Sequence, residues 1–255
     1  MSKLAGVQLY SLREELALDF AATIGELAEI GFPVAEGYAK MPLAHDSVAQ
    51  LLKAHDIRML SCHLPLPTEE NRQEIMQAIE VYDLRYVVVP SLPREDFVTL
   101  DGVQRVCERL NQANALFQNN DVVFGYHNHD FEFKQFDGRT AYDIMIEELD
   151  PTIILELDTY WAQLAGHDPS ELVRRLGNRS PLLHIKDGEA NRDRRDQPMV
   201  ALGTGKVDIP SIVTASGDYA ECLIVELDSC ATDMMEALRI SYQFLQDQDL
   251  ASGIQ

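Results

Sequence analysis

The chain has 255 residues, near the length of one (β/α)8 barrel, and its 46% apolar content is enough to build a large core. Its formal net charge of −21 argues against nucleic-acid partners, because contacts with phosphates need clustered Lys and Arg. No apolar run is long enough to cross a membrane, no secretory leader pattern is visible, and the four cysteines form no CxxC pair. We therefore expect a cytoplasmic protein with free thiols and no membrane partner.

Short apolar runs with the character of β-strands recur along the chain and alternate with stretches of helical periodicity. The distance from one run to the next is about that of a βα unit. In chain order, the expected strands are Ala5–Ser11, Pro33–Ala39, Arg58–Leu64, Tyr86–Ser91, Val122–His129, Ile153–Trp161, Pro181–Asp187 and Cys222–Ser229.

The clearest helix is Asp19–Ile30, whose apolar residues form one stripe and which Gly31 ends. Further helices are expected over Glu69–Val81, Asp96–Phe117, Ser170–Leu176 and Thr232–Phe244. An unbroken βαβα alternation predicts one α/β domain over residues 1–255, with parallel strands closed into a (β/α)8 TIM barrel. The late Gly203-Thr204-Gly205 lacks the rest of a dinucleotide fingerprint, and we interpret it as a tight turn.

Three consecutive strand-like runs each carry an ionisable residue near the C-terminal end, namely Asp158, His184 and Glu226. The C-terminal ends of barrel strands form the active-site mouth, and side chains alternate faces along a strand, so all three are expected to point into the barrel. Burying such groups unpaired costs several kcal/mol. We therefore favour a shared divalent cation, with buried charge pairs between Lys186 and Glu156 or Glu226 as the alternative.

The fifth strand carries the densest set of polar residues. His127 and His129 share a face and can both look into the mouth. His127 has the position of a fourth metal ligand, and Glu132, just past the strand, is the alternative. If His127 ligates the metal, Glu132 is expected to contact substrate hydroxyls. His129 would lie at the rim and move a proton near neutral pH.

Polar and aromatic residues on other strands complete the expected mouth. Gln8, Glu36 and His63 are the rim candidates on the first three strands and could orient a polyol substrate. For His63 a satisfied structural histidine is an equal alternative. Tyr10 and Trp161 could each form an apolar wall against a sugar ring or belong to the core, and for Trp161 we favour the wall.

The stretches GYHNHDFEF, ELDTYWAQLAGHDP, LLHIKDG and VELD, with the late GTGKVD loop, resemble the xylose isomerase-like TIM barrels known as sugar phosphate isomerases/epimerases. The resemblance covers essentially the whole chain. It implies one divalent cation, Mn or Mg with Co or Zn as alternatives, held by Asp158, His184, Glu226 and a strand-five ligand. Ketose 3-epimerases of this family place a Glu where this chain has His127, and a substrate-binding His where it has Trp161.

We therefore expect a metal-dependent isomerase or epimerase of a sugar or keto-sugar that works through a metal-stabilised enediolate. Glu226 or His129 would take the proton and the other would return it. Lys186 would neutralise the oxyanion or pair with Glu156.

The alternatives are a dehydratase or lyase using the same metal site, and a barrel that binds carbohydrate without turnover. A DNA-repair endonuclease is disfavoured by the −21 charge. The expected partner is a small sugar, and a homo-oligomer stays open.

Overall fold

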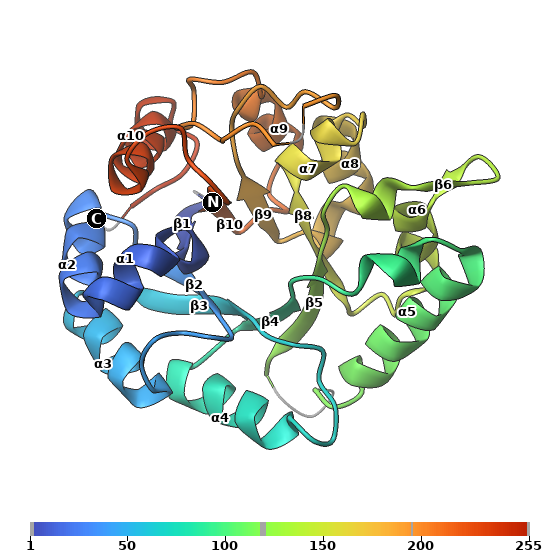
Figure 1. Cartoon of the computed structure of the whole chain (residues 1–255), viewed down its shortest axis with the longest axis horizontal. Helices are drawn as coiled ribbons and strands as arrows, with labels where there is room; N and C mark the ends of the chain where they lie inside the picture. Colours follow the sequence, from blue (N-terminus) through green and yellow to red (C-terminus); the bar gives the residue numbers. More distant parts are fainter. Residues whose placement is uncertain (1–2, 118–120, 195, 254–255) are drawn as a thin grey trace.

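The computed structural model describes residues 3–117, 121–194 and 196–253. Its main sheet is a closed barrel of parallel strands in the order β1-β10-β9-β8-β5-β4-β3-β2, with helices around it (Figure 1). The predicted (β/α)8 barrel is therefore confirmed. The barrel strands are β1 (Leu4–Gln8), β2 (Val34–Tyr38), β3 (Arg58–His63), β4 (Tyr86–Val89), β5 (Val123–His127), β8 (Ile154–Asp158), β9 (Leu182–Ile185) and β10 (Cys222–Val225).

The helices lie outside the barrel, and the five that periodicity predicts are present with ends shifted by a few residues. A small hairpin, β6 (Gln135–Phe136) with β7 (Arg139–Thr140), lies apart from the barrel. Within the described residues, no helix combines the length and the apolarity that a bilayer crossing requires. The helices are α1 (Arg13–Leu18), α2 (Phe20–Ile30), α3 (His45–Ala54), α4 (Arg72–Tyr82), α5 (Leu100–Asn114), α6 (Ala141–Glu148), α7 (Thr159–Leu164), α8 (Pro169–Leu176), α9 (Ile209–Ala215) and α10 (Met234–Asp247).

The sixth barrel strand is shorter than its sequence predicts. The run of β-prone residues suggests a strand up to Trp161, but β8 ends at Asp158 and α7 begins at Thr159. The Asp158 carboxylate accepts a hydrogen bond of 2.8 Å from the Trp161 backbone N–H and so caps the helix. Trp161 therefore belongs to the first turn of a helix, and the strand assignment for this residue is wrong.

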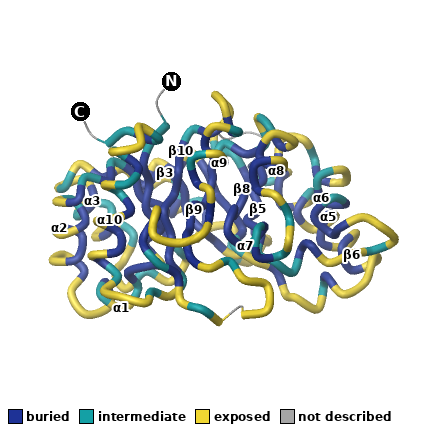
Figure 2. Tube along the Cα trace, turned by 90° about the horizontal axis from the view of Figure 1, so that it is seen from above, coloured by how far each residue is buried: buried dark blue, intermediate teal, exposed yellow. Residues whose placement is uncertain are grey.

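The core has two parts on either side of the barrel wall. Outward-facing strand residues pack against the helices in one large apolar cluster, while a smaller cluster fills the inside of the barrel. Figure 2 shows the strands as the buried centre and the exposed positions on helices and loops. The inner cluster is formed by Val34, Leu60, Tyr86, Val88, Ile154, Leu182, Cys222 and Ile224.

An irregularity in β3 decides where His63 points. The pairing of β2 with β3 runs from Ala35 opposite Met59 to Glu36 opposite Ser61, so Leu60 is left over. An extra residue of this kind is a β-bulge, which shifts the alternation of faces beyond it. Leu60 belongs to the inner cluster, and strict alternation from it would point His63 outward. The bulge instead brings His63 to the inside.

Candidate metal centre and active site

Ionisable side chains form a second layer inside the barrel, at the C-terminal ends of the strands above the apolar cluster. All are nearly or fully buried, and hydrogen bonds and ion pairs connect them. The alternation predicted for β8, β9 and β10 is confirmed, because it places their ionisable ends on the same face as the inner apolar residues. The layer consists of Glu36, His63, His127, Glu156, Asp158, His184, Lys186 and Glu226, together with the uncharged amide of Gln8.

Four of these residues could hold one metal ion. One ligand atom from each of His127, Asp158, His184 and Glu226 lies within 4.8 Å of all the others. Metal–ligand bonds of about 2.0–2.4 Å allow ligand atoms to be up to about 4–5 Å apart around one ion. The donor set therefore fits a divalent cation. It also matches the sequence-based set, with His127 rather than Glu132 as the residue from β5.

A second group of metal-capable residues lies against the first and shares two residues with it. His63 and Glu156 join His127 and His184 within the same 4.8 Å limit. In this group, Glu156 Oε2 lies 2.6 Å from His63 Nε2 and 3.0 Å from His127 Nδ1. His63 and Glu156, the two residues that only the second group contains, are thus paired with each other.

Lys186 forms ion pairs with both carboxylates of the first group. Its Nζ lies 2.9 Å from Asp158 Oδ2, 2.7 Å from Glu226 Oε2 and 2.8 Å from Asp228 Oδ2. Glu156, the other partner offered from sequence, instead contacts His63 and His127. The Lys186 ammonium therefore supplies positive charge where a divalent cation would also be attracted, and the two cations repel each other.

Gln8 and Glu36 do not line the mouth, although the sequence suggested them as substrate contacts. Both are fully buried, and the Gln8 amide donates to Glu36 Oε1 at 2.8 Å. The same oxygen lies 2.7 Å from His184 Nε2, while His184 Nδ1 lies 2.8 Å from Glu226 Oε2. A carboxylate on one ring nitrogen fixes a histidine whose other nitrogen faces a metal. Glu36 thus fixes the orientation of the His184 ring through its Nε2 atom.

The charges of this layer shift each other's pKa values. Burial alone would lower the pKa of His184, but the carboxylates of Glu156, Glu226 and Glu36 raise it well above its usual value. Burial and the neighbouring Glu36 raise the pKa of Glu156 to about 7. Burial alone would raise the pKa of Glu226, but Lys186 and His184 lower it. Because a ligating imidazole must be neutral, metal binding here would release a proton.

A cavity of about 510 Å³ opens above this layer. His63, His127, His129 and Glu226 line its inner end. Burial and then the charge of Lys186 lower the pKa of His129 to about 3, so this imidazole is neutral near pH 7. Its Nδ1 is buried without a hydrogen-bond partner among the described residues. His129 therefore faces the cavity as a neutral imidazole, at the rim position expected from sequence.

Glu132 turns away from the metal-capable group. Its two carboxylate oxygens accept hydrogen bonds from the Tyr126 hydroxyl at 2.7 Å and from the His129 backbone N–H at 2.9 Å. Tyr126 belongs to the apolar cluster outside the barrel. Glu132 thus neither joins the metal-capable set nor lines the cavity, and in this structure its part is to hold the end of β5.

Trp161 lies beside the cavity's inner end, half-buried on α7. Its ring centroid is 6.0 Å from that of His129 and 5.6 Å from Lys186 Nζ. It packs partly against the outer apolar cluster. Its expected role as a wall for a sugar ring stays a prediction.

Two polar residues that the sequence analysis did not single out support the site. Asn128, between the two inward histidines of β5, accepts a hydrogen bond of 3.0 Å from the Asp158 backbone N–H and so ties β5 to β8. Asp228 pairs with Lys186 and lines the cavity. The sequence signal for Asn128 was a polar amide at a position that alternation places on the outer, apolar side of β5, between two inward histidines.

The Gly203–Gly205 loop is a structural turn, as expected. The backbone N–H groups of Gly203 and Gly205 donate to Asp187 Oδ2 at 2.9 and 3.0 Å. A side chain at Gly205 would collide with Asp187, since an added Cβ would lie 2.1 Å from Oδ1. These amides are therefore occupied by a buried carboxylate of the same chain.

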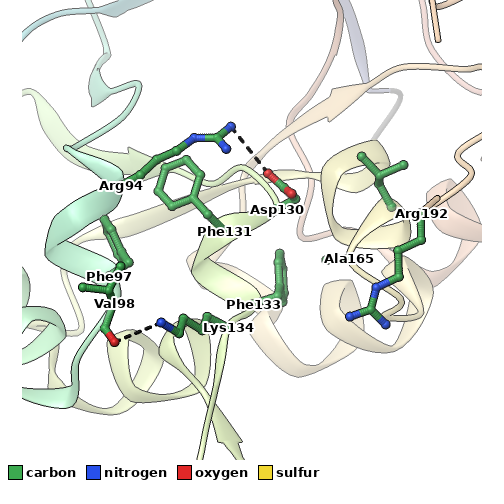
Figure 3. Close-up of a pocket in the computed structure, with 10 residues that line it drawn as sticks. Arg94, Phe97, Val98, Asp130, Phe131, Phe133, Lys134, Ala165 and Arg192 are labelled. Carbon is green, nitrogen blue, oxygen red and sulfur yellow. Dashed lines mark hydrogen bonds and ion pairs between the residues drawn. The ribbon is translucent and has the colours of Figure 1, made fainter. Parts of the chain in front are cut away.

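A separate cavity of about 400 Å³ lies beside this site, formed by the segments that follow β4, β5, β8 and β9 (Figure 3). Phe97, Phe131 and Phe133 line it, and Arg94 stacks over Phe131 at 4.9 Å. None of the residues that the sequence analysis proposed for the site lines this cavity. The candidate site is therefore the cavity above the ionisable layer.

Known proteins share this architecture. Residues 24–247 match the family model of the xylose isomerase-like TIM barrel. A sugar phosphate isomerase/epimerase from Parabacteroides distasonis ATCC 8503 is 25% identical with a TM-score of 0.81, covering 99% of this chain and 96% of that one.

Two more distant structures share the fold alone. A D-allulose 3-epimerase from Methylomonas sp. is 15% identical with a TM-score of 0.72, over 97% of this chain and 99% of that one. The probable 3-DHS dehydratase AsbF from Bacillus anthracis is 15% identical with a TM-score of 0.72, over 95% and 98%. A comparison with curated proteins found no match.

Proposed function

This chain belongs to the xylose isomerase-like TIM barrel family, and from that premise we propose that it is a divalent-cation-dependent isomerase or epimerase of a sugar or keto-sugar. The observation that carries the proposal is the meeting of His127, Asp158, His184 and Glu226, two of which, His127 and Glu226, line the cavity. Burying such a set has a high cost in free energy unless the groups are paired or bind an ion.

The same four residues would hold the cation. Two imidazoles and two carboxylates suit Mn, with Co or Zn as alternatives, better than Mg, which prefers oxygen ligands. When bound, the cation supplies positive charge that stabilises negative charge developing on substrate oxygens.

Glu226 and His129 are the residues that move the proton. Both line the cavity, and near neutral pH Glu226 is a carboxylate and His129 a neutral imidazole, for the reasons given above. Glu226 takes a proton from the carbon next to the substrate carbonyl. A neutral imidazole has both an N–H and a lone pair, so His129 can give its N–H proton to another atom or face of the substrate while its lone pair takes up the proton that Glu226 removed, passed on through water, and both residues return to their starting states. Lys186 keeps a positive charge beside the oxyanion.

Isotope exchange tests this proposal. The Mn-loaded protein is incubated in deuterated water with a panel of aldoses, ketoses and 3-keto-glycosides, and NMR follows deuterium entering the substrate. We expect exchange that is lost in Asp158→Ala and His184→Ala and kept in Asp101→Ala, an exposed control on α5.

Two results would contradict the proposal. Exchange that survives in Asp158→Ala would remove the cation from the mechanism, and no exchange across the panel would remove proton transfer. Signals of an unsaturated product would identify elimination, the dehydratase or lyase alternative, because loss of a leaving group can follow the same proton abstraction.

A further inference from the structure

The cavity above the candidate metal centre has two chemically different parts. Its inner end is formed by the ionisable side chains of His63, His127, His129, Glu226 and Asp228. This end offers donors and acceptors for a polyol.

The outer part of the same cavity is mostly carbon surface. Tyr10 and Tyr38 form one side of it, and Leu64, Pro65 and Pro90 also line it. Tyr10 is 42% exposed, one of few large apolar side chains in the described residues that remain so open. The Tyr10 ring therefore presents aromatic carbon surface to a ligand in the cavity.

Contacts hold the Tyr10 ring in place before any ligand arrives. The Arg13 guanidinium lies 4.5 Å from the ring centroid and also donates to the backbone oxygens of Tyr10 and Asp228 at 3.0 and 3.2 Å. The Tyr38 ring meets Tyr10 edge-on, with centroids 5.5 Å apart. The Tyr10 backbone N–H donates to Gln8 Oε1 at 3.0 Å. A fixed aromatic surface binds a ring with little loss of conformational entropy.

We propose that this cavity takes a glycoside, with its sugar ring at the ionisable end and an apolar ring-shaped aglycone against Tyr10 and Tyr38. The inference rests on the proposed function, which places the sugar at the ionisable end. A cavity of about 510 Å³ is in the size range of drug-like ligands and exceeds the needs of one sugar ring. A free monosaccharide would leave the outer carbon surface in contact with water.

An apolar aglycone fits the outer part better than a second sugar ring does. A second sugar would bring several hydroxyl groups against Leu64, Pro65 and Pro90, whose side chains offer no hydrogen bonds. The polar groups at this end are the two tyrosine hydroxyls, Lys40 and Ser91 among the lining residues. An aryl ring would instead remove carbon surface from water on both sides.

Calorimetric binding constants for phenyl, methyl and disaccharide ligands test the inference. The probes are phenyl and methyl β-D-glucoside, β-D-galactoside and β-D-xyloside, with cellobiose as the two-sugar probe. We expect phenyl glycosides to bind about three- to tenfold more tightly than their methyl counterparts. Tyr10→Ala should remove this advantage, and Tyr10→Phe should keep it. Tyr219→Ala, which removes a 48% exposed tyrosine before β10, is the matched control.

Each outcome has a defined meaning. No phenyl advantage in the wild type, including no binding of any probe, overturns the inference, and so does tighter binding of cellobiose than of phenyl glucoside. An advantage that survives in Tyr10→Ala also overturns it. A phenyl advantage without isotope exchange would remove only the proposed function. Exchange on monosaccharides without a phenyl advantage would remove only the aglycone site.

Discussion

The inside of the barrel has an apolar half and an ionisable half, and the same strands build both. Toward the N-terminal ends of β8, β9 and β10 the inward side chains belong to the inner apolar cluster, and two positions further along they are ionisable. In strand order the apolar residues are Ile154, Leu182 and Ile224, followed by Glu156, His184 and Glu226.

The two halves contribute to the protein in opposite ways. Burying the apolar half stabilises the fold, because carbon surface leaves water. Burying the ionisable half removes charges from water, which only their mutual pairing or a bound cation offsets. The contrast indicates that stability and metal binding are separable within one barrel. Four measurements test this separation.

The largest effect is expected from a change in the ionisable half. Asp158→Asn removes the charge of one candidate ligand but keeps the size of the side chain. Mn affinity should fall at least about a hundredfold, because mutation of residues that only support metal ligands already lowers metal affinity by about 10- to 100-fold. Isotope exchange should be lost. Calorimetric titration with Mn measures the first effect and NMR the second.

The stability of the same variant is its internal control. Asn can still accept the hydrogen bond from the Trp161 backbone N–H that caps α7. Lys186 loses one of its three carboxylate partners but keeps Glu226 and Asp228, so the melting temperature without metal should change little. A collapse of stability with unchanged Mn affinity would show that this half is structural.

A substitution in the apolar half should lower stability and leave Mn binding unchanged. Leu182→Ala removes a fully buried side chain, and the resulting cavity should lower the free energy of unfolding by about 2–5 kcal/mol. Urea unfolding measures this loss. Mn stoichiometry should stay the same in the folded variant, and a loss of Mn binding comparable to that of Asp158→Asn would show that the two halves are not separable.

Lys186 tests the balance of charge inside the ionisable half. Lys186→Met removes an ammonium that lies within 3 Å of two candidate ligands, so Mn affinity at neutral pH should rise about tenfold. Lys40→Met is the matched control, because it removes an exposed lysine from the rim of the same cavity. Weaker Mn binding in Lys186→Met would mean that the ammonium positions the carboxylates rather than competing with the ion.

The smallest effect is a dependence on pH. Burial alone would lower the pKa of His63, but Glu36 and Glu156 raise it from 6.5 to about 10. Because the folded state favours protonated His63, this residue stabilises the protein most at pH values below its unfolded pKa of 6.5. The contribution is lost as the pH rises toward the folded pKa of about 10. The pKa of His184 is raised in the same direction.

The metal-free protein should therefore melt at a lower temperature at pH 8.5 than at pH 6.5. Binding of Mn requires neutral His184, so the increase in melting temperature on adding Mn should grow over the same interval. Thermal unfolding with and without Mn, in matched buffers, measures both trends. If the increase in melting temperature on adding Mn becomes smaller as the pH rises, His184 is not a ligand.

Much of the fold and the core of the site could be predicted from sequence. Strand alternation is a local property, and it placed Asp158, His184 and Glu226 on the inner face correctly. Local sequence could not decide whether His127 or Glu132 is the candidate metal ligand from β5. Glu132 lies beyond the end of β5, where strand alternation no longer sets its direction, and the Tyr126 hydroxyl on the helix side binds its carboxylate.

The repeating βα units and the inward direction of the ionisable strand ends follow from the sequence alone, because periodicity and turn residues act over a few positions, and the number of units predicts the barrel. The pairing of the buried ionisable groups is a property of the folded barrel. Closure of the barrel brings Glu36 from β2 to 2.7 Å from His184 on β9, and the bulge in β3 turns His63 inward. Such pairings join residues far apart in the chain, and their energies depend on distances that exist only once the barrel has closed.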